Sequence, residues 1–403
     1  MNVLVLNCGS SSLKYRLISM PAERELAGGE AQRVGPPTAE PARIYHRIDG
    51  AERTVEVDMP DHGAAFDEVM KLLAESADLR PDVLGHRLVH GADRFGDAAK
   101  IDPEAMESLL AIQDMAPLHN PPATNLIEAC RKRYSNLPQV AVFDTAFHST
   151  IAPHARTYPL PAKIRTDLGI RKYGFHGTSH QYVVTEAARM LEKPIEQFNA
   201  VSCHLGSGGA SLCAVANGRS IDNTMGYSPL QGLIMSTRCG DLDPAVTLRL
   251  LCGNQNDPDA VEKMLNKQSG VLGLSGVSAD IRDVLSGSSD AEGDRQRLWD
   301  TASLYLWRIR KYLGSYLATV GAADAVIFTD TIGETVPAVR EALCVDMDWF
   351  GIHLDAARNA APGELPADVS APDSLVRVLV VQTNEELAIA RQTHRLFDAR
   401  RTA

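Results

Sequence analysis

Two turns rich in glycine and serine give this chain candidate anion-binding sites. Residues 7–14 read Asn-Cys-Gly-Ser-Ser-Ser-Leu-Lys and residues 204–211 read His-Leu-Gly-Ser-Gly-Gly-Ala-Ser. Each turn lies between apolar runs that predict β-strands. Glycine lets backbone N–H groups approach an anion closely, and hydroxyls or a lysine add donors. Both turns therefore favour phosphate binding over an ordinary hairpin turn, and their recurrence in the two halves suggests a duplicated fold.

Several polar residues lie near glycine, proline or the end of a predicted strand, where α/β folds gather their chemistry. They are Arg87, His119, Asp144, His176, His204, Arg238 and Asp241. Arginines and histidines with few acids suit a strongly anionic ligand, and phosphoryl transfer uses such donors together with a metal. A structural ion pair is the alternative for either arginine, and a hydrogen-bonded structural role for each histidine.

Two histidine pairs, His86 with His90 and His176 with His180, have the four-residue spacing that can chelate zinc on a helix. Neither pair has an evident third ligand, which argues against zinc. The seven cysteines include no C-x-x-C pair and indicate free thiols in a reducing compartment. Cys8 and Cys203, beside the glycine turns, are interpreted as packing residues and not as nucleophiles.

Composition narrows the class of protein. The chain has 403 residues, 44% of them hydrophobic, which predicts two or three compact domains. A net charge of −11 argues against nucleic acid as a partner. The N-terminus shows no basic and apolar leader, and no apolar run approaches the ~20 residues that span a bilayer. We expect a cytoplasmic protein with no membrane partner.

Strands alternate with helices along the chain, the pattern of a layered α/β fold. Asn120 is predicted as an N-cap with Pro121 at the first helical position, and Thr178 with Gln181 as a capping box. Asn217-Gly218 predicts a hairpin turn. The predicted strands are 3–6, 13–18, 54–59, 83–89, 139–143, 200–205, 210–215, 325–328 and 375–381. The predicted helices are 64–77, 120–134, 179–191, 244–251, 295–317 and 385–397, and 361–373 is predicted as a loop.

Six segments in order resemble the signature segments of the acetate kinase family, and the resemblance covers essentially the whole chain. They are residues 7–14, 116–122, 142–148, 173–180, 237–240 and 383–387. The resemblance implies two duplicated ribonuclease-H-like domains of the actin-like ATPase superfold with a nucleotide cleft between them. The expected domains are residues 1–147 plus 385–403, whose closing helix returns to the first domain, and residues 148–384. The resemblance also implies a homodimer.

The resemblance further implies reversible transfer of the γ-phosphoryl group from ATP to acetate, giving acetyl phosphate and ADP, with Mg²⁺ or Mn²⁺. Asn7 and Glu385 would lie at the metal site. Arg87 and Arg238 would clamp the carboxylate and the phosphoryl group, and His176 would stabilise the transition state. Asp144 would be the catalytic carboxylate, with His119 in the same pocket. Because acetate is ionised near neutrality, Asp144 is expected to orient other groups and not to take a proton.

The same resemblance assigns substrate and nucleotide contacts. An apolar wall around the acetate methyl would consist of Val89, Leu118, Phe175 and Pro229. The nucleotide-binding residues would be Lys14, His204, Leu205, Gly206, Ser207, Gly208, Asp280, Ile281, Arg282, Thr331, Ile332, Gly333, Glu334 and Thr335.

The chain departs from the family pattern at three places. Ser207 replaces the usual asparagine of the second glycine turn, and Ser236 replaces a glycine before Thr237. After Phe328-Thr329 the family usually has Ala-Gly-Ile-Gly-Glu-Asn, whereas residues 330–335 here read Asp-Thr-Ile-Gly-Glu-Thr. Side chains where glycine is usual can block a ligand. A pyrophosphate donor, a propionate or butyrate kinase, and a chaperone-like ATPase of the same superfold are the alternatives.

Overall fold

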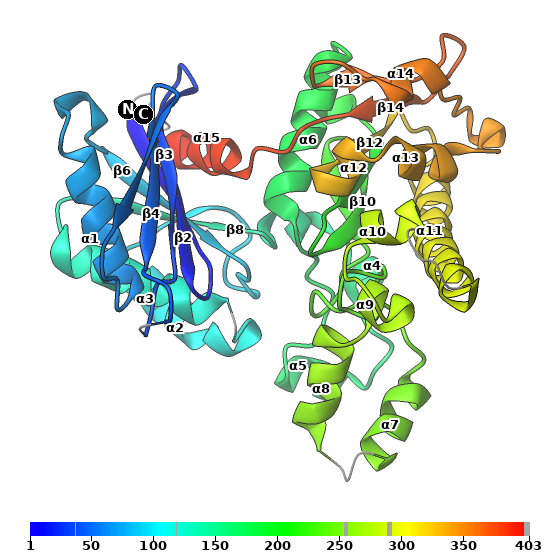
Figure 1. Cartoon of the computed structure of the whole chain (residues 1–403), viewed down its shortest axis with the longest axis horizontal. Coiled ribbons are helices and arrows are strands. Elements are labelled where there is room, and N and C mark those ends of the chain that lie inside the picture. The colour runs from blue at the N-terminus through cyan, green and yellow to red at the C-terminus, as the bar shows by residue number, and fades with distance from the viewer. Residues whose placement is uncertain (37, 118, 254–256, 288–291, 399–403) are drawn as a thin grey trace. The chain divides into compact units, whose positions relative to one another are not determined.

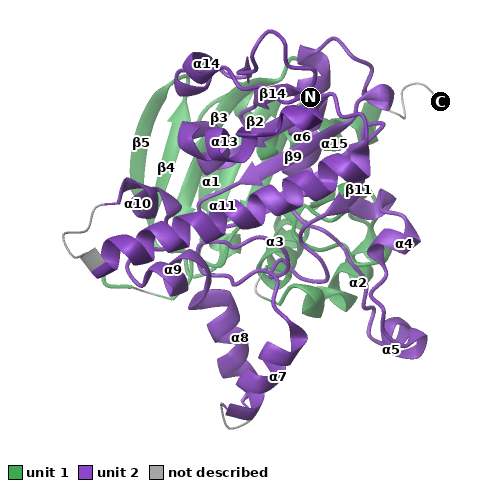
Figure 2. Ribbon diagram, turned by 90° about the vertical axis from the view of Figure 1, so that its right-hand side faces the viewer, with its two compact units in different colours: residues 1–147, 384–403 green, residues 148–383 purple. Residues whose placement is uncertain are grey.

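The structure, shown in Figure 1, is a computed structural model that describes residues 1–403 except 37, 118, 254–256, 288–291 and 399–403. The chain divides into two compact units, which are coloured separately in Figure 2. Unit 1 comprises residues 1–147 and 384–403, and unit 2 comprises residues 148–383. Each unit is an α/β layered structure, as the alternation of strands and helices predicted.

Unit 1 contains an eight-stranded sheet of order β5-β4-β3-β2-β1-β6-β8-β7. Strands β1 to β5 are antiparallel neighbours, whereas β6 pairs parallel with β1 and β8 parallel with β6. The strands are β1 (Asn2–Cys8), β2 (Ser12–Ser19), β3 (Arg24–Gln32), β4 (Arg43–Ile48), β5 (Ala51–Glu56), β6 (Val83–Leu88), β7 (Ala99–Lys100) and β8 (Gln139–Phe143). The helices are α1 (His62–Leu73), α2 (Pro103–Ala111), α3 (Asn120–Arg133) and α15 (Glu385–Asp398), with 3₁₀ turns at Ala77–Leu79 and Gln113–Met115 and another, Ala146–Thr150, where the chain leaves the unit.

Alternation along β1 builds two apolar layers. Leu4 and Leu6 point to the side where α1 and α3 contribute Phe66 and Leu126. Val3 and its neighbours on the opposite face pack against Ile389 and Ala390 of α15. Since side chains alternate between the faces of a strand, a strand buried on both faces reads as a continuous apolar run. The C-terminal helix therefore completes the core of unit 1.

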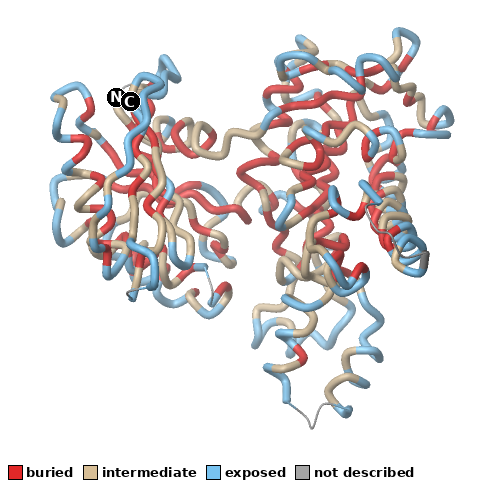
Figure 3. The backbone as a smooth tube through the Cα atoms, viewed as in Figure 1, coloured by how far each residue is buried: buried red, intermediate tan, exposed pale blue. Residues whose placement is uncertain are grey.

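Unit 2 contains a six-stranded sheet of order β11-β10-β9-β12-β14-β13. The strands are β9 (Ala200–Leu205), β10 (Ala210–Ala216), β11 (Arg219–Asn223), β12 (Ala325–Thr329), β13 (Ala367–Asp368) and β14 (Arg377–Val380). The helices are α4 (Pro153–Arg156), α5 (Ala162–Asp167), α6 (Gly177–Met190), α7 (Pro244–Gly253), α8 (Pro258–Lys267), α9 (Gly270–Ser275), α10 (Ile281–Ser286), α11 (Glu292–Val320), α12 (Asp330–Thr335), α13 (Pro337–Cys344) and α14 (Ala356–Ala360), with 3₁₀ turns at Ile195–Gln197 and Asp348–Phe350. The central strands of both sheets are buried (Figure 3). No helix in the described part of the chain is long and apolar enough to cross a bilayer.

The two sheets repeat one arrangement. In each, three antiparallel strands (β1 to β3, β9 to β11) are followed by two parallel ones (β6 and β8, β12 and β14) on the other side of the first strand. The glycine turns match as well. Gly9 N–H donates to Ser12 O at 2.9 Å, and Gly206 N–H donates to Gly209 O at 3.0 Å. The duplication expected from the two turns is thus visible in the backbone.

Several element predictions are confirmed and others are wrong in detail. The strand at 139–143 is confirmed, and so is the 217–218 hairpin, where both residues have positive φ, as the tight turn requires. Asn120 is not the N-cap of α3 because His119 takes that position and the Asn120 amide bonds the backbone of His90. Thr178 is already inside α6, which begins at Gly177, so the predicted capping box does not form.

Other bounds move for local reasons. The strand predicted at 54–59 is found as β5, three residues earlier, and the helix predicted at 64–77 is found as α1 and ends at Leu73. The loop predicted at 361–373 contains the short strand β13, which pairs with β14. Strands β3 and β4 were not predicted, because their polar alternation carries a weak apolar signal.

Burial of His86 on β6 makes stability depend on pH. Its Nε2 lies 2.8 Å from Gln139 Oε1, and burial lowers its pKa to about 4. An unfolded histidine binds a proton near pH 6.5, so stability is lost as the pH falls from about 6.5 towards 4, by about 2 kcal/mol at pH 5. Unfolding measured at pH 7 and pH 5 should show a smaller loss in His86→Gln than in the wild type. The exposed His154→Gln serves as the control, and an equal loss in all three proteins would contradict the assignment.

Candidate active site

A compact charged cluster forms in unit 1 at the ends of β1, β6 and β8. Asp144 follows β8, is buried, and accepts hydrogen bonds from Arg87 Nε at 3.2 Å and Nη2 at 2.7 Å. Arg87 Nη1 lies 3.5 Å from Asn7 Oδ1 and 3.4 Å from Glu385 Oε2, at the start of α15. We call these four residues the Arg87 cluster. Parallel strands bring their carboxyl ends to one edge, which is why distant sequence segments meet here.

The electrostatics of the Arg87 cluster are unbalanced towards negative charge. Burial alone would lower the pKa of Arg87, but the negative charges of Asp144 and Glu385 outweigh burial and raise it. One guanidinium thus faces two carboxylates and the amide oxygen of Asn7. Carboxylate and amide oxygens are ligands that Mg²⁺ accepts alongside water and phosphate. The donor set therefore fits a hard divalent cation bound by few protein ligands.

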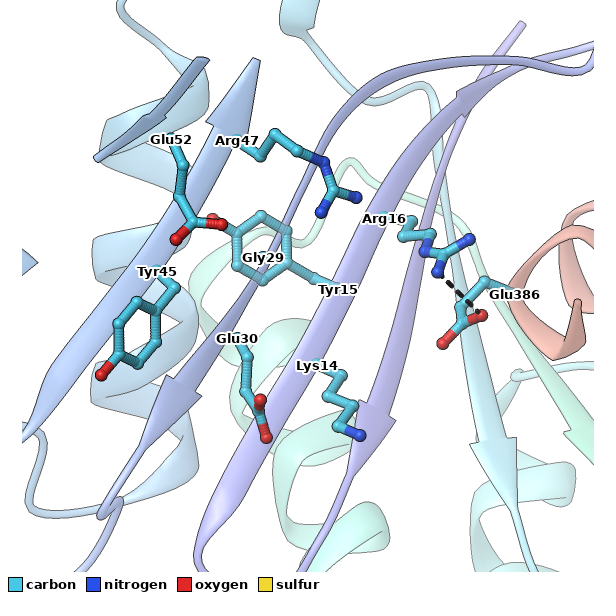
Figure 4. Close-up of a pocket in the computed structure, with 9 residues that line it drawn as sticks. All are labelled: Lys14, Tyr15, Arg16, Gly29, Glu30, Tyr45, Arg47, Glu52 and Glu386. Carbon is cyan, nitrogen blue, oxygen red and sulfur yellow. Dashed lines mark ion pairs between the residues drawn. The ribbon is translucent and has the colours of Figure 1, made fainter. Parts of the chain in front are cut away.

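Lys14 lies apart from the polar contacts of that cluster, on β2 opposite Asn7 in the sheet register. It lines a cavity of about 420 Å³ on the sheet of unit 1, together with Arg16, Glu30 and Arg47 (Figure 4). Arg16 lies 3.8 Å from Glu386, and Arg47 lies 2.6 Å from Glu25, so these charges are largely compensated. The predicted phosphate role of Lys14 stays a prediction.

The other unit 1 residues predicted for the site are only partly described. His119 is exposed as the N-cap of α3, and Val89 is half-buried just after β6. Leu118 lies outside the described residues. His119 and the apolar wall remain predictions.

Unit 2 positions two histidines beside the second glycine turn. His176 precedes α6 with φ of 59°, a left-handed conformation that is unusual outside glycine. Its ring lies 4.2 Å from the ring of His204, the penultimate residue of β9. A hydrogen bond of 2.9 Å joins His176 Nδ1 to Ser211 Oγ, and another of 2.9 Å joins His204 Nδ1 to Ser179 Oγ. Ser179 and Ser211 thus fix both rings.

The glycine turn itself is open where these side chains gather. A Cβ placed on Gly209 would lie 3.5 Å from His176 Nε2 and 3.6 Å from Arg238 Nη1, and one on Gly208 would meet nothing within 4 Å. Arg238 Nη1 donates to the Pro229 carbonyl at 3.4 Å, and among the described residues no carboxylate pairs with Arg238. Burial lowers the pKa of Arg238. We call Arg238, His176, His204 and residues 206–209 the Gly209 cluster.

An arginine with no acidic partner beside backbone N–H groups is suited to bind an external anion. Backbone groups in such turns and guanidinium forks are preferred ligands of phosphate. Ser236, which stands where the family pattern has glycine, donates from Oγ to the Gly208 carbonyl at 3.1 Å. This hydrogen bond stabilises the turn. Burial raises the pKa of the Cys203 thiol on β9 and that of Cys8, to about 12 for Cys8, in keeping with packing roles for both.

The remaining predicted nucleotide residues form two further groups. Asp280 accepts hydrogen bonds from the backbone and guanidinium of Arg282, at 2.9 and 2.5 Å, and caps α10 next to Ile281. Residues 331–335 lie on α12, which directly follows β12. The last residue of β12, Thr329, pairs with His204 of the parallel strand β9. Glu334 Oε1 accepts from the N–H of Asp330 at 2.8 Å and of Thr383 at 3.0 Å.

The structure thus brings together two subsets of the predicted residues, one in each unit. Phe175 is buried next to His176, and Pro229 contacts Arg238, so both lie by the Gly209 cluster. Sequence reasoning missed three hydroxyl residues next to the histidines, Ser179, Ser211 and Thr383. Ser179 Oγ lies 2.8 Å from Thr383 Oγ1. These residues lie just after the glycine turn or within the motif segments, and that position was the feature of the sequence that could have indicated them.

Known proteins resemble this chain over nearly its whole length. A family model described as the acetokinase family matches residues 2–391. An acetate kinase of Acetivibrio thermocellus is 45% identical, covering 98% of this chain and 99% of that protein. A crystal structure of Porphyromonas gingivalis acetate kinase has a TM-score of 0.91 at 37% identity, covering 98% of this chain and 99% of that one. A propionate kinase from Francisella tularensis has a TM-score of 0.88 at 33% identity, covering 97% and 98%.

The Arg87–Asp144 pair should contribute more stability than an exposed pair of the same types. Asp144→Ala leaves a half-buried guanidinium without its main partner and should cost about 3–5 kcal/mol. Asp97→Ala is the matched control, because its partner Arg395 is 56% exposed and such pairs contribute at most about 1 kcal/mol. Calorimetric melting of both variants measures the difference, and equal losses would show that Asp144 does not hold Arg87.

Proposed function

The chain belongs to the acetokinase family, a family of phosphotransferases of the two-domain ribonuclease-H-like fold, and we propose that it transfers the γ-phosphoryl group of ATP reversibly to acetate. An acetate oxygen forms the new bond to phosphorus, and the bond from phosphorus to the β,γ-bridging oxygen breaks. The products are acetyl phosphate and ADP. The two compact units would be the two functional domains.

The observation that carries this proposal is the Gly209 cluster. Arg238 lacks an acidic partner among the described residues, and its Nη1 approaches the turn beside His176 Nε2. Planar donors around an open turn suit the equatorial oxygens of a transferring phosphoryl group, where preorganised donors lower the barrier. In the proposal, His204 and residues 205–208 hold donor phosphates, while residues 280–282 and 331–335 hold the rest of the nucleotide.

The Arg87 cluster supports direct in-line transfer without a general base. Acetate is already ionised at neutral pH, because carboxyl pKa values lie near ~4. Both oxygens of Asp144 accept hydrogen bonds from Arg87, so Asp144 is placed to orient that guanidinium. We therefore propose that Asp144 positions Arg87, that Arg87 binds the acceptor carboxylate, and that His119 contributes to the same pocket.

Mg²⁺, or Mn²⁺ in its place, is part of the proposal. Asn7 and Glu385 would hold the ion. Both lie next to the guanidinium of Arg87, which Asp144 also contacts. When bound, the ion would offset the charge of the phosphates. The homodimer and the cytoplasmic location remain proposals drawn from the sequence, and sedimentation velocity of the purified chain tests the dimer.

The proposed activity is tested by initial rates with acetate against ATP, GTP and pyrophosphate, in both directions, with and without Mg²⁺. Acetate and ATP with Mg²⁺ should give acetyl phosphate, trapped as the hydroxamate, and stoichiometric ADP. ADP release that does not depend on acetate would instead favour a chaperone-like ATPase.

Arg238→Ala should reduce kcat by about 10²- to 10³-fold, the usual scale for losing one preorganised transition-state donor. The melting temperature should change little, since Arg238 makes no ion pair among the described residues. Arg189→Ala removes a 69% exposed arginine from α6 and is the control that should keep full activity. Near-normal turnover of Arg238→Ala would remove this residue from the proposed machinery.

Acid selectivity tests the proposed apolar wall of Val89, Leu118, Phe175 and Pro229. One methylene in such a pocket is worth about 1–3 kcal/mol, so propionate should have kcat/KM about 10- to 100-fold below acetate. Phe175→Ala enlarges the pocket and should raise the ratio of propionate to acetate turnover. A wild-type preference for propionate or butyrate would instead make this chain a kinase of longer acids.

A further inference from the structure

Asp330 places a carboxylate against the second glycine turn. Its Oδ2 lies 3.0 Å from His204 Nε2. A Cβ added to Gly206 would come within 2.3 Å of the same oxygen, so the carboxylate covers the turn at its first glycine. No other carboxylate is paired with His204 in the described part of the chain.

The position of Asp330 is held firmly by its surroundings. Its Oδ1 accepts from the backbone N–H of Thr331 at 2.6 Å and from Thr331 Oγ1 at 3.0 Å. Its own N–H donates to Glu334 Oε1 at 2.8 Å. Its φ of 63° is left-handed, a conformation that aspartate tolerates better than most residues and glycine adopts freely. The backbone thus turns this side chain towards His204.

The carboxylate is ionised. Burial would raise the pKa of Asp330, but the hydrogen bond and charge of His204 and the N–H of Thr331 outweigh burial and lower it to about 2. The other His204 nitrogen, Nδ1, is engaged by Ser179, so a ligand that binds this ring must compete with Asp330 for Nε2. A donor phosphate that approached this nitrogen would meet a fixed negative charge of the same sign.

We propose that Asp330 is an internal anion that occupies the phosphate position at His204, so that a donor phosphate binds there only by displacing it. The inference rests on the proposed function for the identity of the ligand. In consequence, Asp330 lowers the affinity for the donor by repelling its phosphate charge and does not affect binding of the adenosine moiety. Thr331, which stands where the family pattern has glycine, holds the carboxylate through its N–H and hydroxyl.

The test compares Asp330→Asn and Asp330→Gly with the wild type in calorimetric titrations with pyrophosphate, ADP and adenosine, without divalent metal. The asparagine keeps the size, the acceptor for Thr331 and the tolerance of positive φ, but removes the charge. Affinity for pyrophosphate and ADP should rise by about 10-fold or more, the scale for losing one nearby like charge. Affinity for adenosine should stay within about twofold of the wild type, because it carries no phosphate.

The matched control is Asp373→Asn, which removes the same charge from another aspartate of unit 2 that lies 3.0 Å from a histidine, His353. It should leave all three affinities unchanged. Unchanged or weaker pyrophosphate binding in both Asp330 variants would overturn the proposal, and so would an equal gain for adenosine, which would show simple steric blocking. The glycine variant guards against misfolding, since glycine accepts this φ without strain.

This titration separates the inference from the function it rests on. If the wild type and all variants make no acyl phosphate while pyrophosphate affinity still rises in Asp330→Asn, the activity is wrong and Asp330 remains an internal anion. If acetyl phosphate forms normally but the affinities do not change, the activity stands and the role of Asp330 is wrong.

Discussion

The hydrogen bond that closes each glycine turn is the interaction on which the rest of this structure depends. Gly9 and Gly206 each donate to the carbonyl three residues later, within the hairpin that joins the first two strands of each sheet. A turn of four residues closed in this way lets small residues present their N–H groups outward. Because both sheets repeat the strand order, the same edge of each unit can carry a charged ligand.

The two clusters nevertheless have opposite electrostatic character. The Arg87 cluster sets two carboxylates and an amide against one guanidinium, so its excess charge is negative and suits a metal ion. In the Gly209 cluster, Arg238 has no carboxylate partner among the described residues, and the one carboxylate against the turn is that of Asp330, on His204, so the Arg238 side of the cluster suits an anion. One duplicated backbone has thus acquired two complementary charge patterns through side chains at strand ends. A reaction between two anions with a metal needs both patterns.

Sequence reasoning recovered the elements whose apolar pattern is strong and the residues that lie in signature segments. It failed where tertiary contacts override local preference. Asn120 looks like an N-cap, but its amide is bonded to the backbone of His90, and the cap falls one residue earlier. The left-handed conformation of His176 starts α6 two residues before the predicted beginning and so cancels the capping box.

The site shows the same division between what local sequence can and cannot specify. Arg87 and Asp144 were identifiable from their motifs, but their bidentate contact is a consequence of parallel pairing between β6 and β8, which no spacing reveals. Ser179 and Ser211 carry little chemistry of their own and become important only because their hydroxyls contact imidazoles, Ser179 that of His204 and Ser211 those of His176 and His180.

The effect of a residue that differs from the family pattern depends on the backbone conformation at its position. Ser207 and Ser236 also differ from the family pattern and lie in the same region as Asp330. Ser236, however, only donates a hydrogen bond to the Gly208 carbonyl and so supports the turn. At residue 330 the φ is positive and the carboxylate lies 3.0 Å from His204 Nε2, where the imidazole stabilises it. The same substitution on a neighbouring residue with ordinary φ would project elsewhere. Several residues of this region differ from the family pattern. Residue 330 is the one whose charge and backbone conformation together change the electrostatics of the glycine turn.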